Sequence, residues 1–250
     1  NLQLRRERNL QKNIYKMNEI EFLSDKLINK IAAGEVLESP ASAVKELVEN
    51  SIDAGARKID IFIKGGGKVE ITVSDDGHGI SKLDLEKAIS RHATSKLNTQ
   101  TLNGIKTMGF RGEALSSIAS VSDFTLKTNQ NSSSSGYEIK AISGEIKYIK
   151  PVSQKKGTYV KLRNLFFSTP ARLKFLKSEN YESLRIKKLI QRFALVNYNI
   201  QFNLYINNKK VIKTIPILNK NIQFLNRVRE VLGDEFVENS IELNCTENKL

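Results

Sequence analysis

A stretch of alternating residues interrupted by three glycines constrains the fold of this 250-residue chain more than any other feature. Residues 58–64 place three isoleucines on one side of an extended segment, because successive side chains of a strand point to opposite faces. Gly65–Gly67 supply a turn, and residues 69–75 alternate again, with Val69 the first of three apolar residues on one side. The pattern predicts an antiparallel hairpin that buries one face.

The elements around this hairpin come in an order that is typical of a layered α+β sandwich. Helices precede the hairpin, and further helices and hairpins follow it, which differs from the regular alternation of strands and helices in a parallel sheet. Helices are expected between Ser24 and Gly34 and at 40–53, 83–89, 113–119 and 181–196, and strands at 123–128, 137–141, 145–150, 158–162, 200–206 and 210–215.

The chain divides into three expected parts. Residues 1–16 are basic and show no clear hydrophobic period, which indicates a flexible arm or a non-native extension. Residues 17–215 are expected to form the first domain, and residues 216–250 to begin a second α/β domain that is truncated. Residues 91–112 are polar and contain glycine, and a loop of this length inside a compact domain is often functional.

The charge balance favours a polyanionic partner. Lysine and arginine number 40 against 27 aspartates and glutamates, a formal net charge of +13 that suits nucleic acid, nucleotides or an acidic membrane surface. A merely basic surface is the alternative. The single cysteine, Cys245, excludes an internal disulfide and a cysteine-based zinc site. No apolar run approaches the roughly 20 residues that span a bilayer, so we expect no membrane partner.

Residues 40–53 are expected to form a helix with an apolar stripe and a polar face. The polar face carries Glu46, Glu49, Asn50 and Asp53 at helical spacing. A carboxylate and an amide oxygen four residues apart match the oxygen ligands that Mg²⁺ takes in proteins. An ordinary solvated charged face is the other interpretation.

Asp75 is in phase with the apolar residues of the second strand, which predicts a carboxylate on the buried side at the end of that strand. Burying a charge without a partner is costly, so Asp75 needs a hydrogen-bond donor, and a ligand amine such as that of adenine would serve. The turn that follows contains Gly77 and Gly79, where backbone can approach a flat ring closely. A plain turn also explains this short pattern.

Gly104 and Gly109 precede the helix expected at 113–119. Free amides at a helix start, together with the helix dipole, form a binding site for anions. The segment is not a Walker A loop, because Phe110 and Arg111 stand where lysine and serine or threonine are required. A glycine-rich surface loop with a helix cap is the alternative.

Five sequence blocks occur in order along the chain: NKIAAGEV (29–36), KELVENSIDAGA (45–56), DDGHGI (75–80), RHATSK (91–96) and GFRGEAL (109–115). Together they resemble the MutL-type DNA mismatch-repair proteins, which are members of the GHKL ATPase superfamily. A further stretch, GTYVKLRNLFFSTPARLKFL (157–176), is similar to the block that ends the MutL ATPase domain. Five blocks in register are far more specific than any one of them.

The resemblance implies a fold and a set of residue roles. The implied fold is a GHKL-type ATP-binding sandwich, a mostly antiparallel sheet with helices on one face. Glu46 is similar to the family's general base, Asn50 to its Mg²⁺ ligand and Asp75 to its adenine-binding aspartate. The other residues expected to hold ATP are Asp53, Gly77, Gly79, Thr94, Ser95, Lys96, Gly109, Phe110, Arg111, Gly112, Glu113, Ala114, Leu115 and Thr158, of which 94–96 and 109–115 form the lid over the triphosphate.

The resemblance also implies an ATP-driven switch in mismatch repair. ATP is expected to order the lid and residues 17–26, after which two copies, or one copy and a paralogue, pair until hydrolysis resets them. The expected partners are DNA, bound as single or double strand without sequence preference, and a mismatch-recognition protein of the MutS type. The expected location is a bacterial cytoplasm, or a nucleus in a eukaryote.

Two departures from the family pattern qualify these expectations. Asp76 stands where the family often has asparagine, outside the inferred contact. The family's second domain supplies a lysine to the γ-phosphate, and that part is not included in the 250 residues. We therefore expect this chain to bind ATP and to hydrolyse it poorly.

A basic stripe indicates where DNA phosphates could bind. Three cations of the expected helix at 181–196 lie at i, i+3 and i+7, opposite an apolar face. A solvated face is the alternative interpretation. With three cations nearby in the sequence, the candidate patch consists of Arg172, Lys174, Lys177, Arg185, Lys188 and Arg192.

Two other classes of function compete with the switch. Within the superfamily, a sensor kinase needs a phospho-accepting histidine, but both histidines of the chain lie inside the ATP-site blocks, and the lid sequence disfavours a topoisomerase subunit. A heat-shock chaperone is the third possibility of that kind. The remaining alternative is a DNA-binding scaffold of the same fold with little or no ATPase activity. The variant Glu46→Ala separates the two, because a switch keeps nucleotide binding and loses turnover.

Overall fold

The computed structural model describes residues 37–90, 108–109, 112–131, 135–217 and 220–241, together with residues 22 and 93. Several sequence predictions lie outside these ranges. They concern the basic arm at 1–16, the helix between Ser24 and Gly34, and Cys245. Thr94, Ser95, Lys96, Phe110 and Arg111 of the expected lid also lie outside the described residues.

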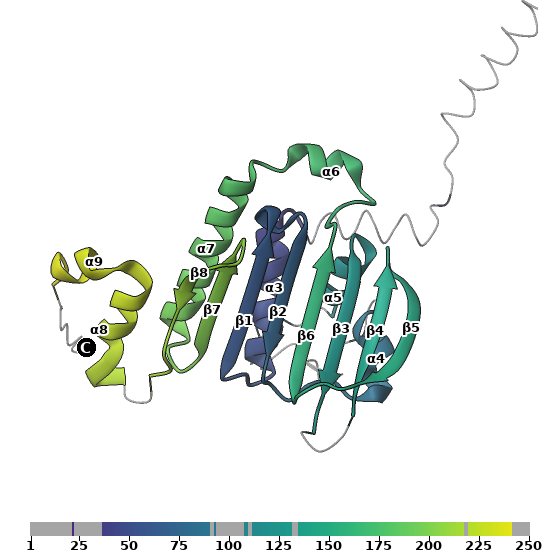
Figure 1. Ribbon diagram of the computed structural model, residues 1–250, viewed down its shortest axis with the longest axis horizontal. Coiled ribbons are helices and arrows are strands. Elements are labelled where there is room, and N and C mark those ends of the chain that lie inside the picture. Colours follow the sequence, from purple (N-terminus) through teal and green to yellow (C-terminus); the bar gives the residue numbers. More distant parts are fainter. Residues whose placement is uncertain are drawn as a thin grey trace, which may run out of the picture.

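Eight strands form one sheet in the order β5-β4-β3-β6-β2-β1-β7-β8 (Figure 1). Every neighbouring pair is antiparallel except β1 and β7, which run parallel. The predicted class, α+β with a mostly antiparallel sheet, is therefore confirmed. The strands are β1 (Lys58–Lys64), β2 (Glu70–Asp75), β3 (Asp123–Asn129), β4 (Gly136–Ile142), β5 (Glu145–Val152), β6 (Gly157–Arg163), β7 (Gln201–Ile206) and β8 (Lys209–Lys213).

Helices cover one face of this sheet and leave the other face open. α3 contacts β2, α5 contacts β3 and β4, and α7 contacts β7. In Figure 1 the strands lie in front of α3 and α5, so the open face is turned toward the reader. The helices are α3 (Pro40–Asp53), α4 (Leu85–Ala88), α5 (Ala114–Ser120), α6 (Pro170–Phe175), α7 (Glu179–Val196), α8 (Lys220–Leu232) and α9 (Asp234–Glu238), with short 3-10 turns at Gly65–Gly67 and Lys82–Asp84.

The predicted helix at 40–53 has the expected start, end and buried stripe. Ser39 caps it by accepting a 3.3 Å hydrogen bond from the amide of Ser42, and Pro40 opens the first turn, where its missing N–H costs nothing. Gly55, with φ +70°, follows its end. Its apolar side chains and the isoleucines of β1 form the core between helices and sheet, with Ile59 and Ile61 fully buried.

Local details differ from the sequence predictions at several elements. Val69 was expected inside the second strand, but it is 53% exposed, because the 3-10 turn at Gly65–Gly67 delays the start of β2 until Glu70. The single helix expected at 83–89 is a 3-10 turn followed by α4. The last strand ends at Lys213 rather than at residue 215. No local pattern in the sequence predicted α6, α8, α9 or the parallel pairing of β1 with β7.

A fully buried arginine attaches α8 to the rest of the molecule. The side chain of Arg227 is 0% exposed, and its guanidinium donates to five backbone carbonyls, four of them within residues 194–200 and one at Ile215. Val231 of the same helix belongs to the hydrophobic core. The five acceptors of Arg227 are the carbonyls of Ala194, Asn197, Tyr198, Ile200 and Ile215, at 2.6, 3.4, 2.9, 3.3 and 2.6 Å. The domain boundary predicted between residues 215 and 216 stays a prediction.

Candidate nucleotide site

The polar face of α3 forms one wall of the candidate site. Its members Glu46, Asn50 and Asp53 are half-buried rather than fully exposed, which favours a binding face over an ordinary solvated one. Lys45 bridges the carboxylates of Glu46 and Glu49 at 3.3 and 2.9 Å. Glu46 therefore already has a cationic neighbour within the protein.

Asp75 lies at the end of β2, where its carboxylate accepts three hydrogen bonds. Ser51 of α3 donates its hydroxyl to Oδ2 at 2.8 Å. The amides of Gly77 and Thr158 donate to Oδ1 at 2.9 and 3.2 Å. An ionised carboxylate has about four lone-pair positions, so these three donors leave room for one more. The hydrogen-bond donors that we expected for the buried carboxylate of Asp75 are therefore supplied largely by the protein. One acceptor position on this carboxylate remains.

Burial dominates the electrostatics of Asp75. Desolvation raises the pKa of this carboxyl above its ordinary value, and the nearby charge of Asp76 acts in the same direction. The hydrogen bonds from Ser51, Gly77 and Thr158 oppose the shift by stabilising the charged form. Shifts of this kind, in a group held by several donors, are found more often at functional sites than elsewhere.

Glycines let three backbone segments pack closely around Asp75. A Cβ at Gly77 would lie 2.8 Å from the Cβ and the carbonyl oxygen of Ala54, and one at Gly79 would lie 2.4 Å from the carbonyl oxygen of Asn129. The sequence predicts that these glycines let the backbone approach a flat ligand ring. In the structure their immediate close contacts are with the protein's own backbone, which is what holds the turn against α3 and β3.

Asp53 connects α3 to the glycine-containing segment. Its carboxylate accepts hydrogen bonds from the amides of Met108 and Gly109 at 3.0 and 3.4 Å. This contact brings Met108 and Gly109 beside the polar face of α3. Asp53 is therefore satisfied by this segment.

The described part of the 112–115 segment leads into α5. Gly112 has φ +66°, which favours glycine, and Glu113 and Ala114 begin the helix. Leu115 packs against the hydrophobic core, so its side chain supports the helix. The sequence analysis assigned all four to nucleotide binding, and that assignment stays a prediction.

Three residues of the site were missed in the sequence analysis: Ser51, Thr128 and Gly157. The hydroxyl of Thr128 accepts from the amide of Ile80 at 2.7 Å and lies 3.4 Å from the hydroxyl of Thr158. A Cβ at Gly157 would lie 2.0 Å from the carbonyl oxygen of Asp75. The available signals were weak: a serine on the sheet-facing side of α3 and a glycine directly before a strand.

The fold is that of a class of ATPases. The family model described as histidine kinase-, DNA gyrase B- and HSP90-like ATPase matches residues 38–163. Within this class, the MutL mismatch-repair protein of Agrobacterium fabrum is 46% identical over 226 residues, which are 90% of this chain and 37% of that protein. The MutL protein of a Wolbachia from Brugia malayi is 49% identical over 230 residues, 92% of this chain and 36% of that protein.

Solved structures place the chain in the same family. The Aquifex aeolicus MutL ATPase domain complexed with ADP superposes with a TM-score of 0.65 at 36% identity, covering 79% of this chain and 70% of that one. The N-terminal domain of a DNA repair protein superposes with a TM-score of 0.69 at 30% identity, covering 83% and 60%. The chain belongs to the MutL family of DNA mismatch-repair proteins, as its sequence blocks predicted. It spans a little over a third of the length of the curated relatives, 36% and 37% of the two named above.

Proposed function

We propose that this chain is the ATP-binding, slowly hydrolysing switch domain of a MutL-type protein. The observation that carries the proposal is Asp75, fixed at the buried end of β2 with one acceptor position left, beside the half-buried polar face of α3. A carboxylate held in this way selects a ligand that brings a hydrogen-bond donor. The exocyclic amine of adenine is such a donor, and the solved relative with ADP bound supports a nucleotide as the ligand.

Each residue of the site has a proposed task. Glu46 orients and deprotonates the attacking water, since phosphoryl transfer demands mainly positioning and charge neutralisation from the protein. Asn50 offers an amide oxygen to Mg²⁺, a cation that keeps several waters and needs few protein ligands. The described residues hold no cluster of three His, Cys, Asp or Glu side chains suited to a metal, so Asn50 is the one protein ligand proposed. Thr158 lies beside Asp75, to which its amide donates.

The proposed lid consists of residues 94–96 and 109–115. The amides of Met108 and Gly109, at the start of its second part, donate to Asp53, and residues 112–115 lead into α5. Phosphate groups that bind Gly112 and its neighbours would therefore act on a segment that is also hydrogen-bonded to Asp53 at the end of α3. We propose that ATP orders this segment together with residues 17–26, and that this ordering permits pairing with a second copy or a paralogue.

The partners of the whole protein are also proposals, because the chain spans 37% of the Agrobacterium relative. We propose DNA and a mismatch-recognition protein of the MutS type, in a bacterial cytoplasm. Within the described part of the chain no helix is long and apolar enough to cross a membrane. Of the candidate DNA patch, Arg185, Lys188 and Arg192 lie exposed on α7.

The rest of the candidate patch lies near the turn into α7. Lys174 of α6 and Lys177, which follows it, are exposed. Arg172 is only half-exposed, since its guanidinium donates to the carbonyl of Leu37 and lies 5.7 Å from the ring centre of Phe166. Arg172 is thus the member least available to phosphates.

Mg²⁺-dependent binding of a non-hydrolysable ATP analogue tests the proposed nucleotide site directly. We expect the chain to bind, Asp75→Asn to abolish binding, and Asn50→Ala to remove its Mg²⁺ dependence. Turnover is measured in a longer protein that includes the second domain, where Glu46→Ala should keep binding and lose hydrolysis. A folded chain that binds no analogue under any condition would favour the DNA-binding scaffold instead.

A further inference from the structure

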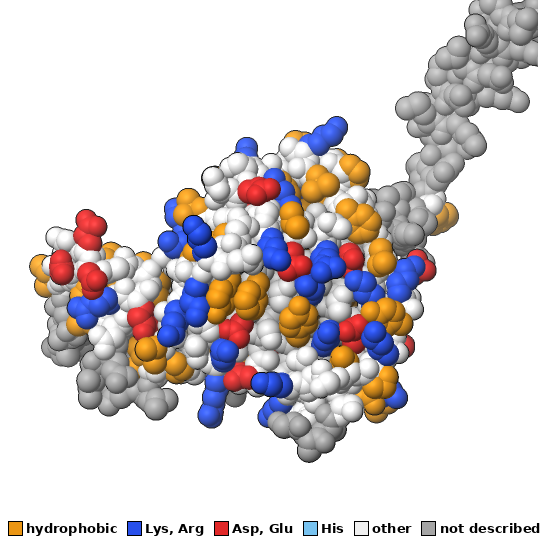
Figure 2. All heavy atoms as spheres, in the orientation of Figure 1, with side chains coloured by type: hydrophobic (Ala, Val, Ile, Leu, Met, Phe, Trp, Pro, Cys, Tyr) orange, Lys and Arg blue, Asp and Glu red, His pale blue; other side chains and the backbone are white. Residues whose placement is uncertain are grey.

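The face of the sheet that the helices leave open carries an unusual excess of cations. Figure 2 shows this face, with lysine and arginine side chains spread among hydrophobic ones. Each of its five carboxylates is already bonded to at least one cation, and Glu70 contacts three of them. The face presents nine cations, Lys58, Lys64, Lys127, Lys140, Lys150, Lys161, Arg163, Lys210 and Lys213, against Asp60, Glu70, Asp123, Glu138 and Glu145.

Aromatic rings lie among these cations. Phe62 of β1 stacks on Tyr205 of β7 with ring centres 4.6 Å apart and planes inclined by 10°, and Phe62 is 38% exposed. Tyr159 of β6 lies on the other side of β2, and Lys127 sits 5.9 Å from its ring centre. Tyr148 of β5, which is 40% exposed, lies 4.7 Å from the Nζ of Lys150. The rings thus form a row across the strands.

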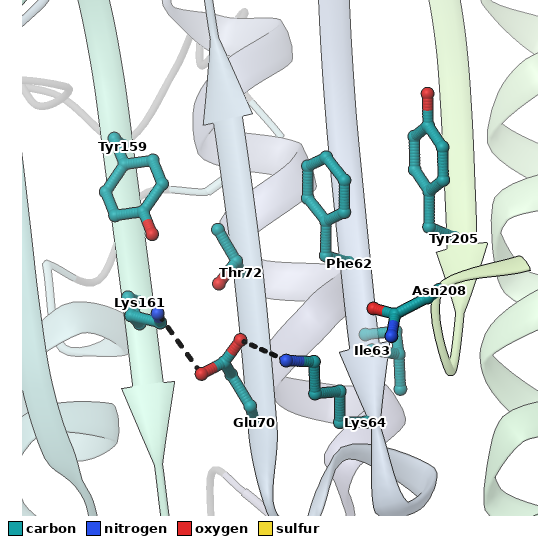
Figure 3. Close-up of a pocket in the computed structure, with 9 residues that line it drawn as sticks. All are labelled: Phe62, Ile63, Lys64, Glu70, Thr72, Tyr159, Lys161, Tyr205 and Asn208. Atoms are coloured by element: carbon teal, nitrogen blue, oxygen red, sulfur yellow. Dashed lines mark ion pairs between the residues drawn. The ribbon is translucent and has the colours of Figure 1, made fainter. Parts of the chain in front are cut away.

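A hollow of about 200 Å³ separates two of these rings. Thr72 of β2 forms its floor between Phe62 and Tyr159, as Figure 3 shows. Neighbouring strands lie about 4.8 Å apart, and β2 lies between β6 and β1, so the distance from β6 to β1 is roughly 10 Å in total. This distance leaves space for a flat group beside either ring. At one end of the hollow, Glu70 contacts Lys161 at 3.2 Å and Lys64 at 3.8 Å.

This combination matches the chemistry of an unpaired nucleic-acid strand. Bases stack on exposed aromatic rings without regard to sequence, and the surrounding lysines neutralise phosphates. A duplex hides the faces of its bases in the stack, so exposed rings on this face would have no base to stack on. An acidic peptide would satisfy the lysines but would leave the ring faces uncovered.

We infer that the open face of the sheet binds single-stranded DNA, with bases stacked on Phe62 and Tyr159 and phosphates on the lysines around them. The choice of DNA over RNA rests on the proposed function in mismatch repair, whereas the single-strand geometry rests on the face itself. This surface is distinct from the candidate patch, which lies on α6, on α7 and at the turn between them.

The test is binding of a labelled oligothymidylate, measured by fluorescence anisotropy with the wild-type chain and with Phe62→Leu/Tyr159→Leu. Leucine keeps the apolar bulk and removes the flat ring. Because base–aromatic stacking is worth roughly 1–3 kcal/mol per base, each ring should account for about tenfold in affinity. Lys161→Gln should lower the slope of log affinity against log salt by roughly 0.7. Unchanged affinity in the double-ring variant overturns the inference.

Matched controls separate the sheet face from other surfaces. Phe175→Leu changes an 81% exposed ring on α6, outside the face, and should leave affinity unchanged. Arg185→Gln/Lys188→Gln alters the α7 patch, and if this variant alone loses the single strand, the DNA site lies there instead. Tighter binding of a duplex, an oligouridylate or an acidic peptide to the face overturns the assignment to single-stranded DNA.

Two further readouts keep the test independent of folding and of the nucleotide site. The double-ring variant should bind the ATP analogue as the wild type does, so failure of the DNA inference and failure of the nucleotide proposal are distinguishable. Photo-crosslinking of bromodeoxyuridine in the strand to the unmodified protein should mark Phe62, Tyr159 or Tyr205. Crosslinks confined to α6 or α7 contradict the inference.

Discussion

At the scale of single residues, the site depends on a carboxylate whose burial is costly. Asp75 is bonded to Ser51, Gly77 and Thr158, but desolvation still raises the pKa of its carboxyl. Ser51 also donates to the carbonyl of Leu47 at 3.1 Å, so its single hydroxyl proton is shared between two acceptors. An asparagine would fit this arrangement, because its oxygen keeps both backbone donors and its amide can donate to the Ser51 hydroxyl.

The free energy of unfolding should therefore respond to pH through Asp75. Since its folded pKa lies above the ordinary value of 3.8, the folded state binds more protons than the unfolded one between the two values. The contribution of Asp75 to the free energy of unfolding of the wild type is greatest below pH 3.8, and it falls as the pH rises through the folded pKa. In urea titrations, Asp75→Asn should gain stability relative to wild type across this window and keep the gain above it. A gain that shrinks as pH rises would contradict the shift.

Gly157 offers a second prediction at this scale. A side chain there would meet the Asp75 carbonyl at 2.0 Å, and its φ of +117° is one that L residues rarely adopt. We expect Gly157→Ala to lower the free energy of unfolding by at least about 2 kcal/mol, through strain and a clash that β6 cannot relieve without moving Thr158. The affinity for the ATP analogue should also fall. Thermal and urea unfolding measure the change in stability, and titration with the analogue measures the change in affinity.

Gly55→Ala is the matched control for that substitution. Gly55 also has positive φ, +70°, but nothing lies within 4 Å of an added Cβ. The cost of an alanine at this position is therefore only that of the left-handed backbone conformation, about 1 kcal/mol in the free energy of unfolding. Equal losses in the two variants would show that backbone strain, rather than close packing at Asp75, sets the requirement for glycine.

At the scale of elements, α8 depends on one side chain. Arg227 donates to carbonyls at the end of α7, before β7 and after β8, and the carboxylate of Glu230 lies 3.3 Å from its Nε. These carbonyls lie at or near the ends of secondary-structure elements, where the guanidinium supplies hydrogen-bond donors. The carbonyls of Asn197 and Tyr198, which Arg227 also contacts, accept in addition the amides of Ile200 and Ile217. Desolvation lowers the pKa of Arg227, although Glu230 opposes the shift.

Arg227→Met should therefore be among the most destabilising single changes. It removes the guanidinium donors from the carbonyls of Ala194, Ile200 and Ile215, and because a lost buried hydrogen bond costs about 1–3 kcal/mol, we expect a loss of roughly 3 kcal/mol or more. Arg227→Lys should lose less, because three donors replace part of the network. Arg229→Met, on the 51% exposed neighbour, is the control and should change stability by less than about 0.5 kcal/mol. Similar effects at both positions, in urea unfolding, would contradict this role.

At the scale of the whole molecule, local patterns predicted more than long-range contacts did. The period of two in β1 and the cap at Ser39 were sufficient for the hairpin and for α3, because these signals depend on neighbouring residues. The parallel pairing of β1 with β7 joins residues far apart in sequence, which no local period reveals. Arg227 was not anticipated because arginine is almost never fully buried unless it is paired.

In the candidate site, too, local patterns were visible in the sequence and long-range contacts were not. The helical spacing of Glu46 and Asn50 and the phase of Asp75 were visible in the sequence. The contribution of Ser51 was not, because it depends on how α3 lies against β2. The same holds for the row of aromatic rings on the open face, because Phe62, Tyr148, Tyr159 and Tyr205 come from four strands that lie in one sheet only after folding.

Whether α8 belongs to the first domain decides how the molecule unfolds. The sequence placed a boundary between residues 215 and 216, whereas Arg227 and Val231 attach α8 to α7 and to the core. If these contacts dominate, α8 should unfold together with the sheet, since small domains usually unfold in one cooperative transition. Native-state hydrogen exchange should then give α8 amides near Arg227 the same opening free energy as those of β1. In Arg227→Met the α8 amides should become less protected than those of β1. Early exchange of α8 in the wild-type chain would instead support the boundary.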